Sequence, residues 1–227
     1  SSKIAIIYNG FRDICKITPK ELNVSKPYFF TIGAVKERKN TFNIVKAFSE
    51  FKKTDAPHKL VIAGKTGNKY SKKVFDFVKE NNLQNEVIFF GHSDDSESSY
   101  LFKNAEALVF PSLIESFGFP VLEAGACGTP TITSIGQGSA EVAGDAGILV
   151  NPLDVNEIKN AMKEFYKVQA ISYLTKDKRK HALDTYEKLI TLDLNLEERR
   201  EIKERLMELY QKLGKVREFG LLRDKGE

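Results

Sequence analysis

The chain carries, near its centre, the stretch Ala107-Leu-Val-Phe-Pro111-Ser-Leu-Ile-Glu115-Ser-Phe-Gly118-Phe-Pro-Val-Leu-Glu123-Ala-Gly-Ala-Cys-Gly128-Thr-Pro130. Its first four residues are apolar and predict a buried strand, and Gly118 and Pro120 then interrupt the chain before a helix begins. Proline suits the first turn of a helix, because its missing N–H would have no partner there. We therefore expect a loop carrying Glu115 and a helix carrying Glu123. Backbone N–H groups at the helix start, beside two carboxylates, can bind a phosphate and sugar hydroxyls together.

Short apolar runs alternate with amphipathic segments on both sides of this stretch. We predict strands at 29–33, 60–64, 87–91, 107–111, 130–134 and 147–150, and helices at 41–53, 69–81, 97–104, 120–127 and 156–166. Several strands are continuous apolar runs, as in sheets covered on both faces. The alternation indicates an α/β, Rossmann-like fold, in which a parallel sheet has right-handed crossovers and helices on both faces. Ligands of such sheets bind beyond the carboxyl ends of the strands.

Composition indicates an ordinary globular protein, since the 227 residues are 41% hydrophobic and 29% charged. No apolar run approaches the ~20 residues of a membrane span, so we expect at most peripheral membrane contact. Cys15 and Cys127 are too few and too far apart for a disulfide framework, which favours a reducing compartment, and we expect the cytoplasm. Three scattered histidines argue against a zinc site, and a net charge of +4 gives no reason to infer nucleic-acid binding.

The central stretch resembles the E-x7-E signature of retaining GT-B glycosyltransferases of the family-four type. Further segments resemble other motifs of that family and follow in the expected order: Ile7-Tyr-Asn-Gly-Phe11, Phe30-Thr-Ile-Gly33-Ala-Val-Lys-Glu-Arg38-Lys39-Asn40, Leu60-Val-Ile-Ala-Gly-Lys65, Val87-Ile-Phe-Phe-Gly91 and Glu141-Val-Ala-Gly144-Asp-Ala-Gly-Ile-Leu-Val150. The resemblance covers residues 3 to 165 and implies one half of a GT-B fold, the C-terminal domain that binds a nucleotide diphosphate sugar. It implies no cofactor and no metal, and the chain contains no Asp-x-Asp triplet of the metal-dependent class.

The resemblance also implies roles for particular residues. Lys39 matches the diphosphate-binding lysine, Arg38 stands beside it, and Gly33 precedes this loop, although Ala34 occupies a position where many members have arginine. Glu115 matches the acid near the donor sugar, and Glu123 matches the acid that accepts hydrogen bonds from the ribose hydroxyls. The backbone N–H groups of Gly118, Phe119 and Val121 are expected to meet the sugar and the diphosphate. The alternative is structural: solvated loop charges, and an acid that stabilises a helix N-terminus.

The character of the chain changes near residue 168. Residues 168–227 contain 14 Lys and Arg and 12 Asp and Glu, no proline, and apolar residues at helical spacing. We therefore predict two domains, 1–167 and 168–227, the second with helices at 177–192 and 197–213 and a short third helix. This second part weakly resembles a tetratricopeptide hairpin, and a plain charged helical hairpin is the simpler alternative.

The sequence therefore predicts the donor-binding half of a retaining glycosyltransferase, a fragment or a split subunit that is inactive without a missing acceptor-binding domain. Its expected partners are a nucleotide sugar, that missing domain and a possible protein bound through residues 168–227. The alternative function is a non-catalytic scaffold or regulatory subunit that binds a sugar nucleotide and carries a helical interaction tail.

Overall fold

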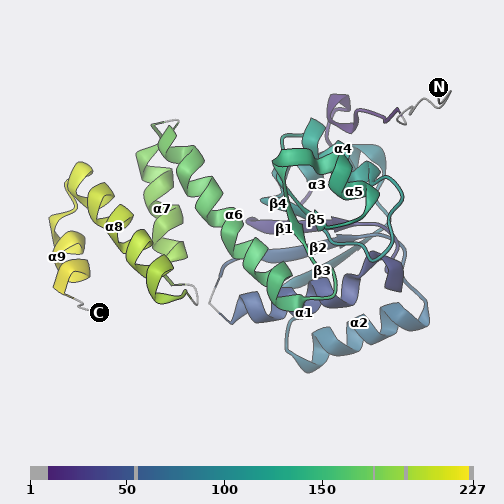
Figure 1. Cartoon of the computed structure of the whole chain (residues 1–227). Coiled ribbons are helices and arrows are strands. Elements are labelled where there is room, and N and C mark those ends of the chain that lie inside the picture. Colours follow the sequence, from purple (N-terminus) through teal and green to yellow (C-terminus); the bar gives the residue numbers. More distant parts are fainter. Residues whose placement is uncertain (1–9, 54–55, 176, 192–193, 225–227) are drawn as a thin grey trace, which may run out of the picture.

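The structure, a computed structural model, describes residues 10–53, 56–175, 177–191 and 194–224. Its sheet is parallel throughout, with the strand order β3-β2-β1-β4-β5-β6 (Figure 1). The six strands confirm the predicted ones to within one residue: β1 (Tyr28–Ile32), β2 (Lys59–Ala63), β3 (Val87–Gly91), β4 (Ala107–Phe110), β5 (Thr131–Ser134) and β6 (Gly147–Val150). The order reverses between β1 and β4, and ligands of doubly wound sheets bind at such a switch point.

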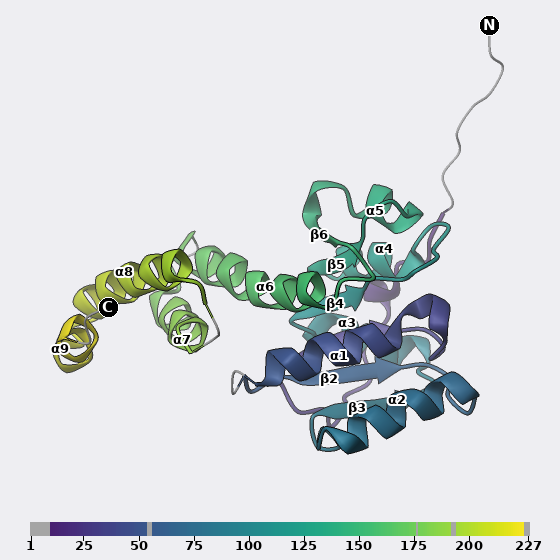
Figure 2. The same cartoon turned by 60° about the horizontal axis from the view of Figure 1, so that its bottom comes forward.

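Helices cover both faces of the sheet, as predicted (Figures 1 and 2). Their bounds are α1 (Thr41–Lys52), α2 (Lys69–Glu80), α3 (Asp95–Asn104), α4 (Phe119–Ala126), α5 (Gly138–Ala143) and α6 (Val155–Thr175), with short 3-10 turns η1 (Ile14–Lys16), η2 (Glu37–Lys39) and η3 (Gly144–Ala146). Strand alternation produces two cores: Phe29 of β1 packs with α1, α2 and α6, whereas Phe30 packs with α3 and α4. The loops that follow the strands line the carboxyl edge of the sheet, between these two layers of helices.

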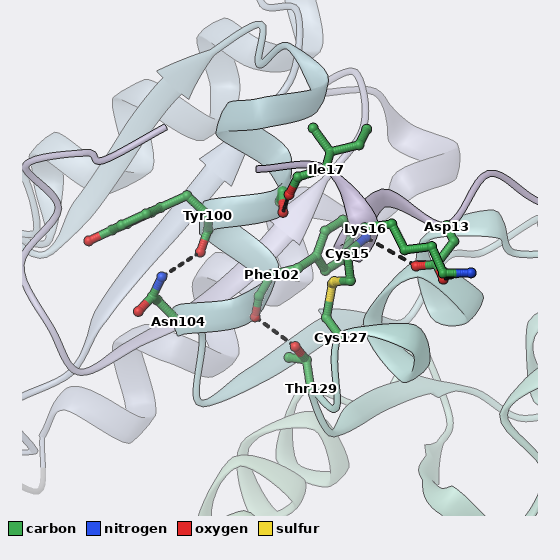
Figure 3. Close-up of a disulfide and its surroundings, with 10 residues drawn as sticks. Asp13, Cys15, Lys16, Ile17, Tyr100, Phe102, Asn104, Cys127 and Thr129 are labelled. Atoms are coloured by element: carbon green, nitrogen blue, oxygen red, sulfur yellow. Dashed lines mark hydrogen bonds and ion pairs between the residues drawn. A yellow bond between two sulfur atoms is a disulfide. The ribbon is translucent and has the colours of Figure 1, made fainter. Parts of the chain in front are cut away.

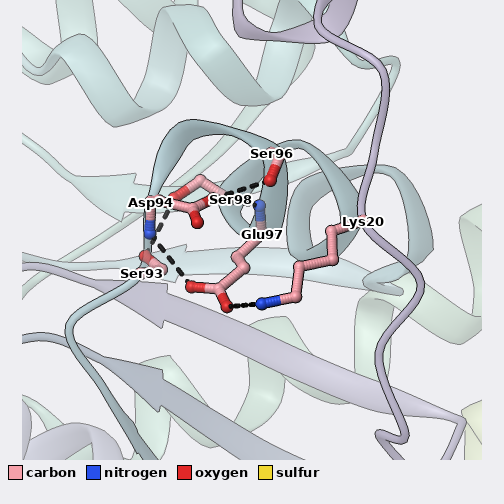
Figure 4. A network of polar contacts seen from close by, with 6 residues as sticks. All are labelled: Lys20, Ser93, Asp94, Ser96, Glu97 and Ser98. Carbon is pink, nitrogen blue, oxygen red and sulfur yellow. Dashed lines mark hydrogen bonds and ion pairs between the residues drawn. The ribbon is translucent and has the colours of Figure 1, made fainter.

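The segment before β1 runs along α3 and α4. Asp94 and Glu97 form a capping box at the start of α3, and Lys20 reaches across to pair with Glu97 at 2.7 Å (Figure 4). Ser99 of α3 donates a hydrogen bond to the carbonyl oxygen of Ile17. The motif that begins at Ile7 has its first three residues outside the described part of the chain.

Cys15 and Cys127 form a disulfide in this region (Figure 3). Their Cα atoms lie 5.3 Å apart although 112 positions separate them in the sequence. The expectation that two cysteines so few and so far apart do not serve as a disulfide framework missed this bond, because the strand crossovers bring η1 against the end of α4. The bond also removes the support that unpaired cysteines lent to a reducing compartment, and the cytoplasmic location stays a prediction.

The C-terminal part is helical, with α7 (Arg179–Leu189), α8 (Leu196–Lys212) and α9 (Val216–Asp224) projecting to one side of the sheet (Figures 1 and 2). Helix α6 was predicted to end near residue 166 but runs unbroken to Thr175, so the predicted boundary at 167/168 falls inside it. Leu183 of α7 and Leu206 of α8 belong to the same apolar cluster as Phe165 of α6. The helices beyond residue 168 therefore extend the apolar core that contains Phe29 and covers one face of the sheet.

Buried His58, directly before β2, shows where these helices lie. Its ring stacks on that of Phe29 at 5.0 Å between centroids. Burial lowers the pKa of His58 to about 3, with smaller contributions from the charges of Lys188 and Lys52. Since Lys188 lies on α7, this helix approaches the amino ends of the strands, the edge opposite to the loops that follow them.

In the described residues, no helix is both long and apolar enough to cross a membrane.

Candidate nucleotide-sugar site

The loops after β1 and β4 lie side by side at the switch point. The backbone N–H of Leu113 donates to the carbonyl oxygen of Arg38 at 2.9 Å. Arg38 thus connects the two loops through its backbone, while its side chain is exposed at the edge. This contact brings the predicted cationic loop against the loop that carries the first predicted acid.

Lys39 and Glu115, predicted from separate motifs, form an ion pair between their side chains. Both side chains are largely buried, at 14% and 12% exposure. The Lys39 ammonium also lies 4.4 Å from the centre of the Phe110 ring, on the last residue of β4. A lysine held by a carboxylate and an aromatic face presents a fixed positive charge at the mouth of the switch point.

Gly33 lies against this lysine. A Cβ on Gly33 would lie 3.4 Å from Cε of Lys39, in van der Waals contact with it, and its φ of +128° disfavours any side chain. Gly64, at the end of the neighbouring strand, is more restricted still, because a Cβ there would lie 1.9 Å from the Gly33 carbonyl oxygen. The glycines that directly follow β1 and β2 therefore allow the two loops to approach closely.

Two residues that the sequence analysis did not name hold Glu115 in place. Its backbone N–H donates to Oε1 of Gln137 at 3.1 Å, and its carbonyl oxygen accepts from the N–H of Gly138 at 3.2 Å. A Cβ on Gly138 would lie 2.0 Å from the carbonyl oxygen of Ser116, so only glycine fits. The Gln137-Gly138 pair is visible in the sequence shortly before the segment that starts at Glu141, but nothing in the sequence says which loop it contacts.

The start of α4 bears out the predicted loop-to-helix geometry. Gly118 occupies the N-cap position with φ +95°, no side chain caps the helix, and proline occupies the first turn. A Cβ on Gly118 would lie 2.7 Å from Cβ of Ser139, so the glycine is required here by packing against α5. Phe119 is 43% exposed beside it.

The predicted role of Val121 needs revision. Its backbone N–H donates to the carbonyl oxygen of Gly118 at 2.9 Å, and its side chain is buried in the second core. This amide already has an acceptor within the first turn of α4. The N–H groups of Gly118 and Phe119 are the ones on which the predicted contact with a ligand now rests.

Glu123 lies on α4, about one turn after Phe119, the first residue of the helix. Burial raises the pKa of its carboxyl group, and the charge of Asp95 raises it further. Within the part of the chain that the structure describes, no group donates a hydrogen bond to this carboxylate. Such a carboxylate is suited to accept hydrogen bonds from a diol that brings its own donors.

Metal binding is not indicated by the described residues, in which no three His, Cys, Asp or Glu side chains lie close enough together to hold an ion. The absence of a metal and of a cofactor from the reaction remains a prediction. Lys39 and Arg38 place two positive charges on the loop after β1 at this edge.

Residues 16–188 match the family described as glycosyl transferases group 1. The chain belongs to this family. The O-antigen chain mannosyltransferase RfbU of Salmonella typhimurium is 29% identical over 191 residues, which make up 84% of this chain and 52% of that protein. The O-antigen chain mannosyltransferase B of Escherichia coli is 31% identical over 132 residues, 58% of this chain and 34% of that protein. The group 1 chain thus spans about a third to a half of these curated relatives.

Solved structures agree on the fold. The C-terminal domain of the group 1 glycosyl transferase LpcC from Francisella tularensis has a TM-score of 0.62 at 22% identity, covering 79% of this chain and 96% of that domain. Sucrose-phosphate synthase from Thermosynechococcus elongatus has a TM-score of 0.59 at 24% identity, covering 91% of this chain and 52% of that one. The predicted fold class, one Rossmann-like half of a GT-B enzyme followed by a helical segment, is confirmed.

Proposed function

We propose that this group 1 chain is the donor-binding half of a retaining glycosyltransferase, which transfers a sugar from a nucleotide diphosphate sugar to an acceptor held by another domain. The observation that carries the proposal is the pairing of Lys39 with Glu115 at the switch point of the sheet. The two residues come from different predicted motifs, and they meet where doubly wound sheets bind nucleotides.

Lys39 acts on the diphosphate in this proposal. Breaking the bond between sugar and diphosphate leaves additional negative charge on the departing phosphate. A fixed ammonium stabilises that charge more in the transition state than in the bound donor, which is the condition for catalysis. Gly33 allows the close approach of Lys39, and Arg38 adds a second positive charge at the rim.

Glu115 faces the donor sugar and Glu123 the ribose. The backbone of Glu115 is held by Gln137 and Gly138, and its carboxylate is held by Lys39, so the carboxylate can accept hydrogen bonds from sugar hydroxyls with little reorganisation. Glu123 provides two acceptor oxygens for the vicinal diol of the ribose. Because both O-antigen relatives are named mannosyltransferases, a mannose-bearing nucleotide is the first donor to test.

Isothermal titration calorimetry with the chain tests the proposal directly. Uridine, guanosine and adenosine diphosphates and their sugars are titrated into the chain, with Lys39→Met as the variant and Lys36→Met, an exposed lysine of the same loop, as the control. We expect one diphosphate to bind in the high micromolar to millimolar range, because half a cleft leaves much of the ligand in water. Absence of binding by all of them, or equal binding to both variants, would contradict the proposal.

A non-catalytic scaffold is the second candidate. The packed helices α7 to α9 beyond the sheet, and Ala34 in place of the arginine of many family members, favour it. Supplying the acceptor-binding half of a group 1 relative in trans discriminates between the two. A transferase half gains sugar transfer with retained anomeric configuration, whereas a scaffold gains none.

A further inference from the structure

Asn40 lies where three loops of the binding edge meet. It is only 2% exposed, and its side-chain amide donates to the carbonyl oxygen of Pro111 at 2.9 Å and to that of Pro152 at 2.6 Å. Pro111 begins the loop after β4 and Pro152 lies in the loop after β6. One carboxamide on the loop after β1 therefore uses both of its N–H bonds to hold two other loops.

This use of the side chain differs from that of the other N-cap asparagines. Asn40 is the N-cap residue of α1, yet its side chain makes no capping hydrogen bond. Asn68 and Asn195, at the N-caps of α2 and α8, each accept a hydrogen bond from the third residue of their helix. The Asn40 backbone is left-handed, at φ +59°, a conformation that asparagine tolerates well. Capping thus does not explain this residue, whereas the connection of loops does.

The connected loops carry the two charges of the site. Lys39 directly precedes Asn40, and Glu115 lies four positions after Pro111. We propose that Asn40 is a positioning residue, whose carboxamide holds the loops after β1, β4 and β6 together and thereby sets Lys39 opposite Glu115. Holding two loops from one short side chain requires two hydrogen-bond donors, since both partners are carbonyl oxygens. The proposal deepens the proposed function and rests on it for its ligand.

Asn40→Asp removes both donors and places carboxylate oxygens against two carbonyl oxygens. It preserves size and the tolerance of a left-handed backbone. Asn40→Gly is the second variant, which removes the donors without adding charge. Asn195→Asp is the matched control, because it makes the same chemical change at an N-cap where aspartate serves equally well.

The first measurement needs no nucleotide. The rate of Lys39 acetylation by acetic anhydride is followed by mass spectrometry, with exposed Lys36 as the internal reference. The ion pair and burial should protect Lys39 in the parent chain and in Asn195→Asp. In both Asn40 variants we expect acetylation of Lys39 to become roughly tenfold faster relative to Lys36, as expected when a buried polar connection is lost.

The second measurement tests whether Asn40 and Lys39 are energetically coupled in nucleotide binding. Asn40→Asp should weaken nucleoside diphosphate binding roughly tenfold in the parent chain and leave it unchanged in a Lys39→Met background, because the two residues then act on the same interaction. A residue that merely stabilises the fold would cause the same loss in both backgrounds. The uncharged Asn40→Gly variant should follow Asn40→Asp in both respects.

The outcomes separate the two proposals. If no nucleotide binds but Lys39 labelling changes as expected, the proposed function fails and the positioning role stands. If nucleotide binds and neither labelling nor affinity responds to the Asn40 variants, the positioning role is overturned. Unfolding of both Asn40 variants while Asn195→Asp remains folded would also overturn it, since Asn40 would then serve general stability.

Discussion

The contact between Lys39 and Glu115 changes what each side chain can do. A diphosphate that binds Lys39 must compete with Glu115, which already holds the ammonium. Removal of the carboxylate therefore does more than delete its proposed contact to the sugar. It leaves a largely buried ammonium in need of a counter-ion, which a diphosphate provides.

Glu115→Gln should consequently bind a bare nucleoside diphosphate more tightly than the parent chain, by roughly three- to tenfold or about 1 kcal/mol. Lys39→Met should bind it more weakly and with a flatter dependence on salt, since the lost interaction is electrostatic. Calorimetry at roughly 50 and 300 mM NaCl measures both effects, because the Debye length shortens over this range and an electrostatic contribution to binding weakens with it. Weaker diphosphate binding by Glu115→Gln would show that the pair does not oppose the ligand.

Glu123 should respond to pH, because its raised pKa moves the loss of its charge toward neutrality. As pH falls through that pKa, the carboxylate gains a proton and accepts hydrogen bonds from a ribose less well. Nucleotide affinity should therefore decline on acidification at a higher pH than for an ordinary glutamate. Glu123→Gln should bind more weakly, by roughly 1.5–3 kcal/mol, and lose this part of the pH dependence. Calorimetry between pH 5 and 8 measures it, and an unchanged pH profile in the variant would contradict the assignment.

Among the elements, η1 and α4 are joined in a way that affects the site. The disulfide attaches the segment before β1 to the residue that follows α4, whose N–H donates to the carbonyl oxygen of Glu123 at 3.1 Å. Lys20 and Ser99 connect the same segment to α3. The entry of the chain into the sheet and the helix that carries Glu123 are thus parts of one packed layer.

Reduction of the disulfide should lower the free energy of unfolding by roughly 2–4 kcal/mol, since the cross-link constrains the unfolded chain. Urea denaturation with and without reductant measures the loss. The double variant Cys15→Ala/Cys127→Ala should be equally destabilised and insensitive to reductant. Two free thiols in the native, unreduced chain, counted by alkylation and mass spectrometry, would contradict the bond.

Considered as a whole, the chain places its candidate site and its helical extension at opposite edges of the sheet. His58 marks the second edge, buried between Phe29 and the layer that α6 and α7 complete. Because the pKa of His58 falls to about 3 on folding, the unfolded chain binds a proton at His58 that the folded chain does not, at every pH between that value and the ordinary one near 6.5.

The contribution of neutral, buried His58 to the free energy of unfolding should therefore be fully present above about pH 6.5. As pH falls below this value, the free energy of unfolding should decline by up to roughly 1.4 kcal/mol per pH unit. His58→Gln, which does not titrate, is the comparison. Urea denaturation between pH 7 and 5 should show a shallower pH slope for the variant than for the parent chain. Equal slopes would mean that His58 is protonated in the folded chain.

The predicted boundary at residue 167 also belongs to this level. A chain ending at Lys167 should still unfold cooperatively, because the complete sheet precedes that point. It should nevertheless be less stable than the full chain, since it ends within α6 and loses the apolar contacts of α7 and α8. The His58 pKa, followed by NMR, should rise toward its ordinary value as α7 is removed. A truncated chain that does not unfold cooperatively would place the boundary elsewhere.

Strands and helices were largely predictable from local patterns, whereas the roles of the candidate site residues rest on the family resemblance and stay predictions. Apolar runs ending at Gly33, Gly64 and Gly91 marked strands, and the Gly118-Phe-Pro120 turn marked the start of α4. Such features depend on backbone sterics and on burial repeated along a few residues, so neighbouring positions suffice to reveal them. The motif order was enough to predict the fold class that the comparisons confirm.

The contacts between loops could not be predicted in this way. Pairing of Cys15 with Cys127, support of Glu115 by Gln137, and the ion pair to Lys39 each join positions that only the strand order brings together. The length of α6 likewise follows from packing against α7, whereas its own residues beyond 166 carry no stop or start signal that local patterns detect. Crossovers in a parallel sheet place distant loops at one edge, and which of those loops meet is a property of the folded arrangement rather than of any segment.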